Sequence, residues 1–314
     1  MLDLRRLRLL REFRQRGSIA ATAAALGYTP SAVSQQLAAL EREAGAPLLD
    51  RTARSAELTD SGRTLAAYAD QILELVEQAE ADLSALSTEP TGRVVVSAFP
   101  TASVAFAPTL AHGLNEYPGL SLSLRQTGPG AGLPLVRSAE VDIALIDDWT
   151  GWLATRDDGA LRFFHLMRDP LVLVVPPDHP LADRSARLDL RRLREEPWLS
   201  TPAGEPSRQA VDRLLAGVGG ALPVPWEFEG LNTILGLVAR GMGVAVVPTL
   251  ALAAGGQDIA VRPLPDPSMG RDVYAVVRAS SVRRPSVSVV LQAIHAAAAA
   301  AAPPPRRRRQ RRQA

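Results

Sequence analysis

The residues with the most specific chemistry lie near the start of the chain, where hydroxyl and amide side chains cluster and two arginines follow. Ser and Thr hydroxyls, with backbone amides at a helix start, bind phosphate oxygens, and a Gln side chain bonds to the edge of a base. The candidates for contacts with a nucleic acid are Ser18, Thr29, Pro30, Ser31, Ser34, Gln35, Gln36, Arg51 and Arg54. Pro30 also offers an apolar surface to a thymine methyl group.

A second set of polar side chains lies in three short segments further along the chain. Each segment follows a strand-like stretch or begins a helix, where hydroxyls and helix N-terminal amides suit a carboxylate or another anion. The residues are Pro100, Thr101, Ser103, Ser200, Thr201, Asn232 and Thr233. Together they predict a cleft with polar groups on both walls, where a small anionic metabolite binds without needing a buried arginine. Helix capping is the alternative for any single residue.

Groups that would support catalysis do not form a recognisable pattern. The four histidines, His112, His165, His179 and His295, are far apart and lack metal-ligand spacing. The neighbouring carboxylates of Asp147 and Asp148 diverge on most backbones, and we interpret them as loop charges. The glycines between residues 128 and 132 and between 241 and 243 make neither a phosphate loop nor a dinucleotide fingerprint. The sequence therefore predicts no enzyme, no cofactor and no metal site.

Composition indicates a globular protein of two domains. The 314 residues are 46% hydrophobic and 22% charged, and the absence of cysteine excludes disulfides and thiolate chemistry. Six arginines follow Ala302, so the net charge of +2 becomes −4 without them. The most apolar stretch, residues 231–252, contains Arg240 and Pro248, and the first residues lack the apolar core of a signal peptide. We expect a cytoplasmic protein without a membrane span.

Three short helices position the first polar set. Leu4, Leu7, Leu10 and Phe13 recur at helical spacing among arginines, which predicts an amphipathic helix with a basic outer face that ends at Gly17. Ser18 caps a second helix over residues 19–26, which Gly27 ends. Thr29 caps a third, with Pro30 at its first position and Gly45 at its end. Two helices joined by a tight turn predict a helix-turn-helix.

A wing and a long helix follow. Residues 48–58 contain Arg51 and Arg54 and are expected to form a small wing, and Thr59 caps a helix whose apolar residues repeat every three or four positions. Such a heptad seam buries little unless a second helix faces it, so it favours a dimer over a helix packed on its own domain. The seam residues are Leu65, Ile72, Val76, Ala79 and Leu83.

From Arg93 onward short apolar strands alternate with segments of helix length, which is an α/β pattern. The predicted strands include residues 94–96, 141–146, 171–175 and 244–247. After the alanines of residues 296–302, the Pro-rich and Arg-rich end is expected to be disordered.

The segment GSIAATAAALGYTPSAVSQQLAALEREAGAPLLDR, from Gly17 to Arg51, resembles the DNA-binding region of LysR-type transcriptional regulators. Residues 98–108, the run MRDPLVLVVPPDHPLA and the run GLNTILGLVARGMGVAVVP resemble the effector domain of that family. Gln35 stands where the family commonly has Arg, which changes the expected base preference from guanine to adenine.

The resemblance implies the following organisation. A winged helix-turn-helix DNA-binding domain occupies residues 1–58 and a dimerisation helix residues 59–89. A bilobed Rossmann-like effector domain of the periplasmic-binding-protein type occupies residues 90–298, and a disordered tail residues 299–314. Lobe I covers about residues 93–168 and 265–298, and lobe II about 169–264.

The implied partners are a double-stranded DNA operator, a small-molecule effector and further copies of the chain in a homodimer or homotetramer. RNA polymerase is a further expected partner. The alternatives are an enzyme or a solute-binding module on the same bilobed α/β fold.

Overall fold

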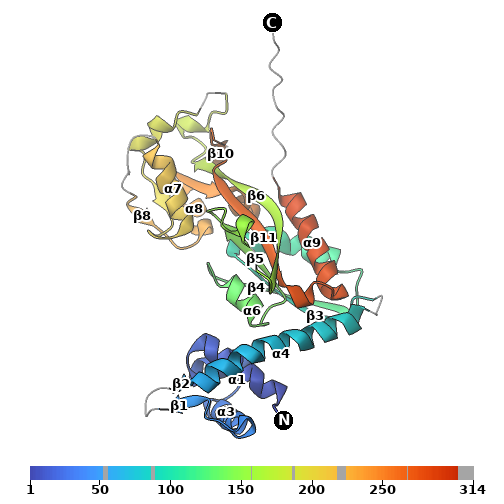
Figure 1. Cartoon of the computed structure of the whole chain (residues 1–314). Helices are drawn as coiled ribbons and strands as arrows, with labels where there is room; N and C mark the ends of the chain where they lie inside the picture. Colours follow the sequence, from blue (N-terminus) through green and yellow to red (C-terminus); the bar gives the residue numbers. More distant parts are fainter. Residues whose placement is uncertain are drawn as a thin grey trace. The chain divides into compact units, whose positions relative to one another are not determined.

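The computed structural model describes residues 1–51, 56–85, 89–156, 158–185, 188–217, 224–266 and 268–302. The chain divides into two compact units, one of Met1–Thr88 with Ala279–Pro285 and one of Glu89–Arg278 with Ser286–Ala314 (Figure 1). Within the described ranges, no helix has the length and apolar character needed to cross a membrane.

The first unit consists of short helices, a hairpin and one long helix. Its elements are α1 (Leu4–Arg16), α2 (Ile19–Leu26), α3 (Pro30–Ala44), β1 (Leu49–Arg51), β2 (Ala56–Leu58), α4 (Asp60–Ala85) and the 3-10 turn η5 (Ala279–Ser281). The boundaries of α2 and α3 match those predicted from the capping residues. Gly17, Gly27 and Gly45 adopt φ values of +72°, +70° and +67°, which a residue with a side chain rarely adopts.

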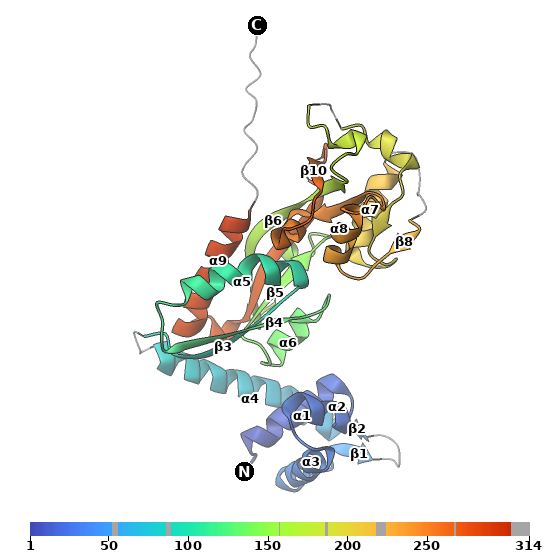
Figure 2. The ribbon, with the colours of Figure 1, turned by 180° about the vertical axis from the view of Figure 1, so that it is seen from behind.

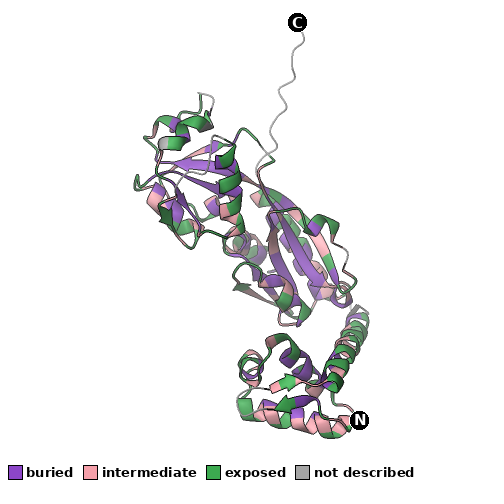
Figure 3. Ribbon diagram, turned by 60° about the vertical axis from the view of Figure 1, so that its left-hand side comes forward, coloured by how far each residue is buried: buried purple, intermediate pink, exposed green. Residues whose placement is uncertain are grey.

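The core of the first unit lies where α1, α3 and the start of α4 meet. Its buried apolar side chains include Leu7, Leu10, Phe13, Val33, Leu37, Leu40, Ala66 and Ala69. On α3 and α4 they recur at helical spacing, so each of these helices buries one stripe and leaves the other faces to solvent (Figure 3), whereas α1 is buried all around at residues 9–13.

The predicted wing is a two-stranded antiparallel hairpin that pairs Leu49 with Leu58 and Arg51 with Ala56. The start of α4 packs closely against it, because Thr59 donates its backbone N–H to the Leu48 carbonyl at 3.0 Å. A Cβ atom at Gly62 would lie 2.1 Å from that carbonyl oxygen. Glycine is therefore required at this position.

The second unit contains one curved mixed sheet with helices on it. Its main elements are β3 (Gly92–Ala98), α5 (Pro100–Gly113), β4 (Leu120–Gln126), α6 (Gly132–Arg137), β5 (Ile143–Asp148), β6 (Leu161–Val175), β7 (Leu199–Ser200), α7 (Pro206–Ala216), β8 (Trp226–Glu227), α8 (Leu231–Val238), β9 (Ala245–Pro248), η4 (Thr249–Ala254), β10 (Ala260–Pro263), β11 (Gly270–Arg278) and α9 (Pro285–Ala301). The strand order is β10-β6-β11-β5-β3-β4, and β9 also pairs with β6.

The long strand β6 belongs to both lobes of this unit. Its first part, Leu161–Pro170, pairs with β11, and its last residues, Leu171–Val175, pair with β9 and β10 (Figure 2). We call the part built on β3, β4, β5, β11 and the start of β6 the first lobe. The second lobe comprises the end of β6 with β7–β10, α7 and α8.

Alternating residues at the end of β6 supply two separate cores of the second lobe. Leu171 and Leu173 pack with the α7 side, which includes Val211. Val172 and Val174 pack with the α8 side. This alternation follows from the period of two along a strand, and it explains why the segment is apolar without interruption.

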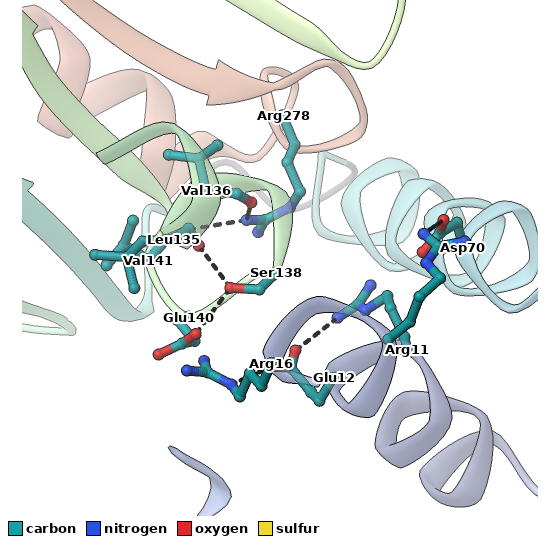
Figure 4. A network of polar contacts seen from close by, with 11 residues as sticks. Arg11, Glu12, Arg16, Asp70, Leu135, Val136, Ser138, Glu140, Val141 and Arg278 are labelled. Atoms are coloured by element: carbon teal, nitrogen blue, oxygen red, sulfur yellow. Dashed lines mark hydrogen bonds and ion pairs between the residues drawn. The ribbon is translucent and has the colours of Figure 1, made fainter. Parts of the chain in front are cut away.

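In the first lobe, α6 packs on one face of the sheet, where Val136 joins Val141, Tyr274 and Val276 in one cluster. The guanidinium of Arg278, at the end of β11, donates to the carbonyl oxygens of Val136 and Val141, each at 2.8 Å (Figure 4). These bonds attach the end of α6 to the sheet.

The C-terminal helix extends into the segment that was expected to be disordered. The expected tail began at residue 299, but α9 continues through Ala301, because the alanine run of residues 296–302 has the highest intrinsic helix propensity. The arginines of residues 306–312 lie outside the described part of the chain.

Candidate functional site

The first candidate site is the exposed face of α3. Pro30, Ser31 and Gln35 are exposed, whereas Val33 and Leu37 on the opposite side are buried in the core. The Thr29 hydroxyl caps the helix by accepting the Ala32 N–H at 3.2 Å. The face therefore presents hydroxyl and amide groups from the first turns of a capped helix, which is suited to the groove of a duplex.

The hairpin places one arginine beside this face. Arg51 Nη1 donates to the hydroxyl of Ser34 at 2.8 Å, and Nη2 lies 3.4 Å from a carboxylate oxygen of Glu41. The other Glu41 oxygen accepts the backbone N–H groups of Leu48 and Leu49, each at 3.0 Å. Glu41 therefore holds the start of the hairpin and the arginine in a defined position next to α3.

Gln36 lies on another side of α3, where its amide oxygen accepts from Arg6 Nε at 2.9 Å. Gln36 is exposed and points about 100° around the helix axis from Gln35, so its contact with DNA stays a prediction. Ser18 caps α2 by accepting the Ala21 N–H at 3.1 Å. Arg54, also predicted, lies outside the described residues.

The basic face expected for α1 is largely neutralised inside the first unit. Arg6 is paired with Glu43, and Arg14 with Asp70. Ion pairs of this kind reduce the charge available to a phosphate backbone. Of the arginines on this helix, Arg5, Arg8 and Arg14 are exposed, and Arg14 is one of the two paired arginines.

Arg11 and Glu12, which are also on α1, are buried (Figure 4). Glu12 accepts from Arg16 Nε at 3.1 Å. Burial lowers the pKa of the Arg11 guanidinium, and the adjacent Glu12 carboxylate opposes that shift. These two residues are buried and do not belong to the basic surface of the first unit.

The apolar residues of α4 serve two surfaces rather than one seam. Leu65 and Ile72 are partly buried and pack against the core of the first unit. Val76 is half-buried. The exposed apolar stripe is Tyr68, Leu75, Ala79 and Leu83, with Leu75 and Leu83 exposed to 67% and 69%.

The second candidate site is a cavity of about 400 Å³ between the two lobes of the second unit. From the first lobe it is lined by residues that follow the carboxyl ends of the parallel strands β3 and β5, and from the second lobe by the starts of α7 and α8. The lining residues include Phe99, Pro100, Thr101, Asp147, Trp149, Thr201, Glu205, Ser207, Glu229, Gly230, Leu231 and Arg271. A crevice at the carboxyl ends of parallel strands is the usual binding position in open α/β sheets.

Arg271 organises the first-lobe wall and is only 4% exposed. Its Nε donates to Asp169, its Nη1 to Asp147 and its Nη2 to the hydroxyl of Thr101, at 2.9, 2.9 and 2.6 Å. The guanidinium also lies 4.5 Å from the ring centroid of Phe99. Arg271 is therefore a buried arginine of the wall that the predicted set did not include.

Asp148 holds the turn that carries Asp147 and Trp149. One of its oxygens accepts the N–H groups of Thr150 and Gly151 at 2.9 and 3.0 Å, and the other accepts that of Leu153 at 2.7 Å. Burial alone would raise the pKa of the Asp148 carboxyl, but hydrogen bonds from Leu153 and Thr150 outweigh it and the pKa is lowered.

Three of the seven residues predicted for the cleft line the cavity: Pro100, Thr101 and Thr201. The hydroxyl of Ser103 bonds back to the Ala98 carbonyl at 3.3 Å. Ser200 is buried and reaches only a void of about 10 Å³ behind the wall.

Asn232 and Thr233, in the first turn of α8, are exposed and lie outside the cavity lining. The prediction is corrected here, because Gly230 and Leu231 occupy the wall at this helix start.

Sequence reasoning missed Arg271, Asp147, Trp149, Glu205 and Glu229. Asp147 and Trp149 directly follow an apolar strand that was predicted, and polar or aromatic residues at such a carboxyl end were an available signal. For Arg271, the signal in the sequence was weaker: a charged residue at the start of an apolar strand. Among the described residues, no cluster of three or more His, Asp or Glu is placed to hold a metal.

Comparison with known proteins matches both parts of the chain. Residues 4–63 match the family description "Bacterial regulatory helix-turn-helix protein, lysR family", and residues 87–299 match "LysR substrate binding domain". A probable RuBisCO transcriptional regulator from Cyanidioschyzon merolae is 31% identical over 80% of this chain and 82% of its own length. A probable transcriptional regulator, LrrA, from Synechococcus elongatus is 27% identical over 93% of this chain and 96% of its own.

Two solved structures share the fold. A full-length OxyR variant from Pseudomonas aeruginosa superposes with a TM-score of 0.68 at 23% identity, over 94% of this chain and 98% of that one. Full-length CbnR, solved in complex with its target DNA, has a TM-score of 0.54 at 20% identity, over 95% of this chain and 100% of that one.

Proposed function

Because the chain belongs to the LysR family of bacterial transcriptional regulators, we propose that α2 and α3 bind a double-stranded DNA operator and that a small molecule bound between the lobes modulates this binding. The protein acts in the cytoplasm, where the DNA lies. Its role is regulation rather than catalysis, as the names of its relatives indicate.

The observation that carries the DNA-binding proposal is the polar exposed face of α3. Pro30, Ser31 and Gln35 stand on the exposed side of a helix whose other side is fixed in the core. Arg51, held beside Ser34 at 2.8 Å and Glu41 at 3.4 Å, places guanidinium N–H donors at the edge of that face. In this arrangement Gln35 reads a base edge, while the hydroxyls and Arg51 contact phosphates.

The proposal of a small-molecule site rests on the cavity of about 400 Å³, which lies within the usual range of ligand pockets, about 300 to 1,000 Å³. Thr101 and Thr201 remain candidate contacts because they line it. A ligand that touches both lobes favours one arrangement of the lobes over others and so shifts their equilibrium.

Homo-oligomer formation through α4 is part of the same proposal. The exposed stripe of Tyr68, Leu75, Ala79 and Leu83 offers an apolar surface along the helix. The two DNA-binding units of a dimer would match the two-fold symmetry of an operator that consists of two half-sites. RNA polymerase remains a predicted partner of the assembled complex.

The test is electrophoretic retardation of the DNA upstream of the protein's own gene at several salt concentrations. Gln35→Ala should weaken specific binding by about 1–3 kcal/mol, because a base contact is lost. Gln15→Ala, which removes an exposed glutamine from α1, is the matched control and should bind as the wild type does. Full affinity of a folded Ser31→Ala/Gln35→Ala variant would refute the assignment of this face.

A further inference from the structure

The charges around the interlobe cavity favour a ligand of one sign. We infer that the small molecule that binds there carries a positive charge on an ammonium or guanidinium group. This inference rests on the proposed function, in which the cavity is the ligand site, and it replaces the anion that the sequence alone suggested.

Arg271, the single arginine among the described lining residues, is already neutralised. Arg271 donates to the carboxylates of Asp169 and Asp147, each at 2.9 Å. Asp169 is fully buried, and its other oxygen accepts the hydroxyl of Thr249 and the N–H of Leu250. The two carboxylates outnumber the guanidinium, so this cluster carries a net charge of about −1 when all three groups are ionised.

Two further carboxylates line the opposite wall without a basic partner. In the part of the chain that the structure describes, no Arg pairs with Glu205 or Glu229. The Glu205 carboxylate accepts the Ser207 hydroxyl at 3.4 Å. Arg208, on the same helix, is engaged by Asp212 at 2.9 Å and Glu227 at 2.6 Å. The cavity wall therefore carries an excess of negative charge.

Hydroxyls of the cavity wall already have hydrogen-bond partners within the protein. The Thr101 hydroxyl accepts from Arg271, and the Thr201 and Ser207 hydroxyls bond to each other at 2.7 Å. Carboxylates stand at two of the helix starts in the wall, because Glu205 is the N-cap residue of α7 and Glu229 directly precedes the N-cap of α8. Neither helix start has a side-chain capping bond, but a negative charge at a helix start reduces the attraction of that start for a further anion.

The aromatic residues of the wall are compatible with a cation. The guanidinium of Arg271 lies 4.5 Å from the Phe99 ring centroid and 5.4 Å from that of Trp149. These contacts hold one cation against the rings. The apolar surface of Pro100 and Leu231 can pack on the methylene chain of an alkylammonium or alkylguanidinium ligand.

The first experiment uses the full chain with two sets of small probes of similar size. Agmatine, spermidine and L-argininamide are the cations, and succinate, benzoate and citrate are the anions. Isothermal titration should show binding by members of the cation set. Glu205→Gln and Glu229→Gln keep the shape of each side chain, and each should weaken that binding by about tenfold.

The matched control is Glu116→Gln/Asp178→Asn, which removes two exposed carboxylates outside the cavity lining and should leave cation affinity unchanged. Tighter binding by the anion set, binding by neither set, or unchanged cation affinity in Glu205→Gln/Glu229→Gln would each overturn the inference.

A second measurement needs no knowledge of the ligand. Caesium and iodide ions quench tryptophan fluorescence, and the emission lost in Trp149→Phe isolates the signal from the cavity wall. Relative to free N-acetyltryptophanamide, caesium should quench this signal more than iodide does, and the preference should fall in Glu205→Gln/Glu229→Gln. A preference for iodide in the wild type would overturn the inference.

Failure of the charge assignment is distinguishable from failure of the proposed function. If an anion binds and changes retardation of the upstream DNA, the regulator function stands and the charge assignment fails. If the cations bind the cavity but the protein retards no upstream DNA, the charge assignment stands and the proposed function fails.

Discussion

Arg271 and Asp169 form a buried ion pair at the base of the interlobe cavity, with exposed fractions of 4% and 0%. Removing one partner of such a pair leaves the other charge without compensation, which costs about 3–5 kcal/mol. We therefore expect Arg271→Gln to lower the free energy of unfolding by about this amount in urea denaturation. Arg168→Gln, which breaks an exposed pair with Asp272, should cost less than about 1 kcal/mol. Equal stability of the two variants would contradict this account.

The contribution of the Asp148 carboxylate to stability should depend on pH. Its pKa is lowered in the folded state, so the stabilisation from its ionised form is fully present above the unfolded pKa of about 3.9 and is lost as the pH falls through the folded pKa. Asp148→Asn should be less stable than the wild type by about 1–3 kcal/mol at neutral pH. The difference should shrink below about pH 4. A difference that stays constant between neutral and acid pH would argue against the hydrogen-bond explanation.

The residues of the cavity show what the sequence could and could not predict. Thr101 and Thr201 were found because each stands where a strand ends and a helix begins. Arg271 was missed because its partners Thr101, Asp147 and Asp169 are separated from it by 170, 124 and 102 positions. Only the order of the strands brings them together, and local spacing contains no signal of that order.

At the scale of elements, the junction of hairpin and α4 depends on Gly62. A methyl group there would meet the Leu48 carbonyl at 2.1 Å, so α4 must move away from the hairpin. Gly62→Ala should cost about 1–3 kcal/mol in unfolding free energy and should weaken DNA retardation, since Arg51 moves with the hairpin. Ser61→Ala, at the neighbouring exposed position, is the control. A Gly62→Ala variant with wild-type stability would show that the junction is less tightly packed than described.

The apolar stripe of α4 predicts different outcomes for two substitutions on one helix. Leu75→Asp places a charge on the exposed stripe and should dissociate the oligomer while leaving the fold intact. Ile72→Asp places it against the core of the first unit and should unfold that unit. Sedimentation equilibrium and circular dichroism separate the two effects. Ala67→Asp, an exposed position off the stripe, should keep both mass and fold, and loss of the oligomer in this control would move the contact elsewhere.

The elements themselves were predictable to different degrees. Helices α2 and α3 were located to the residue because Ser18, Thr29 and the glycines that end them are local signals. The heptad seam of α4 was predicted less well, because a repeat of apolar residues does not say whether the facing surface belongs to the same unit or to another chain. Leu65 and Ile72 face the chain's own core, and only the later positions stay exposed.

For the whole molecule, charge is concentrated at one end of the sequence. Six arginines follow Ala302, and the rest of the chain has a net charge of −4. Truncation after Ala302 should weaken non-specific DNA binding at low salt. It should also reduce the slope of log affinity against log salt concentration by up to about five units. Preference for the operator over unrelated DNA should persist, and an unchanged salt slope would exclude a contribution of these arginines.

The strand order has a consequence for synthesis on the ribosome. In the sheet, β11 lies between β5 and β6, yet β5 ends at Asp148 and β11 begins at Gly270. At a translation rate of about 5–20 residues per second, β11 is synthesised on the order of ten seconds after β5, and the edge of β5 stays unpaired during that time. The second lobe is translated within that interval, so it can fold before the first lobe is complete. The nascent chain therefore presents an open β-edge to the cell until translation has passed Arg278, and this is the period in which chaperone protection matters most.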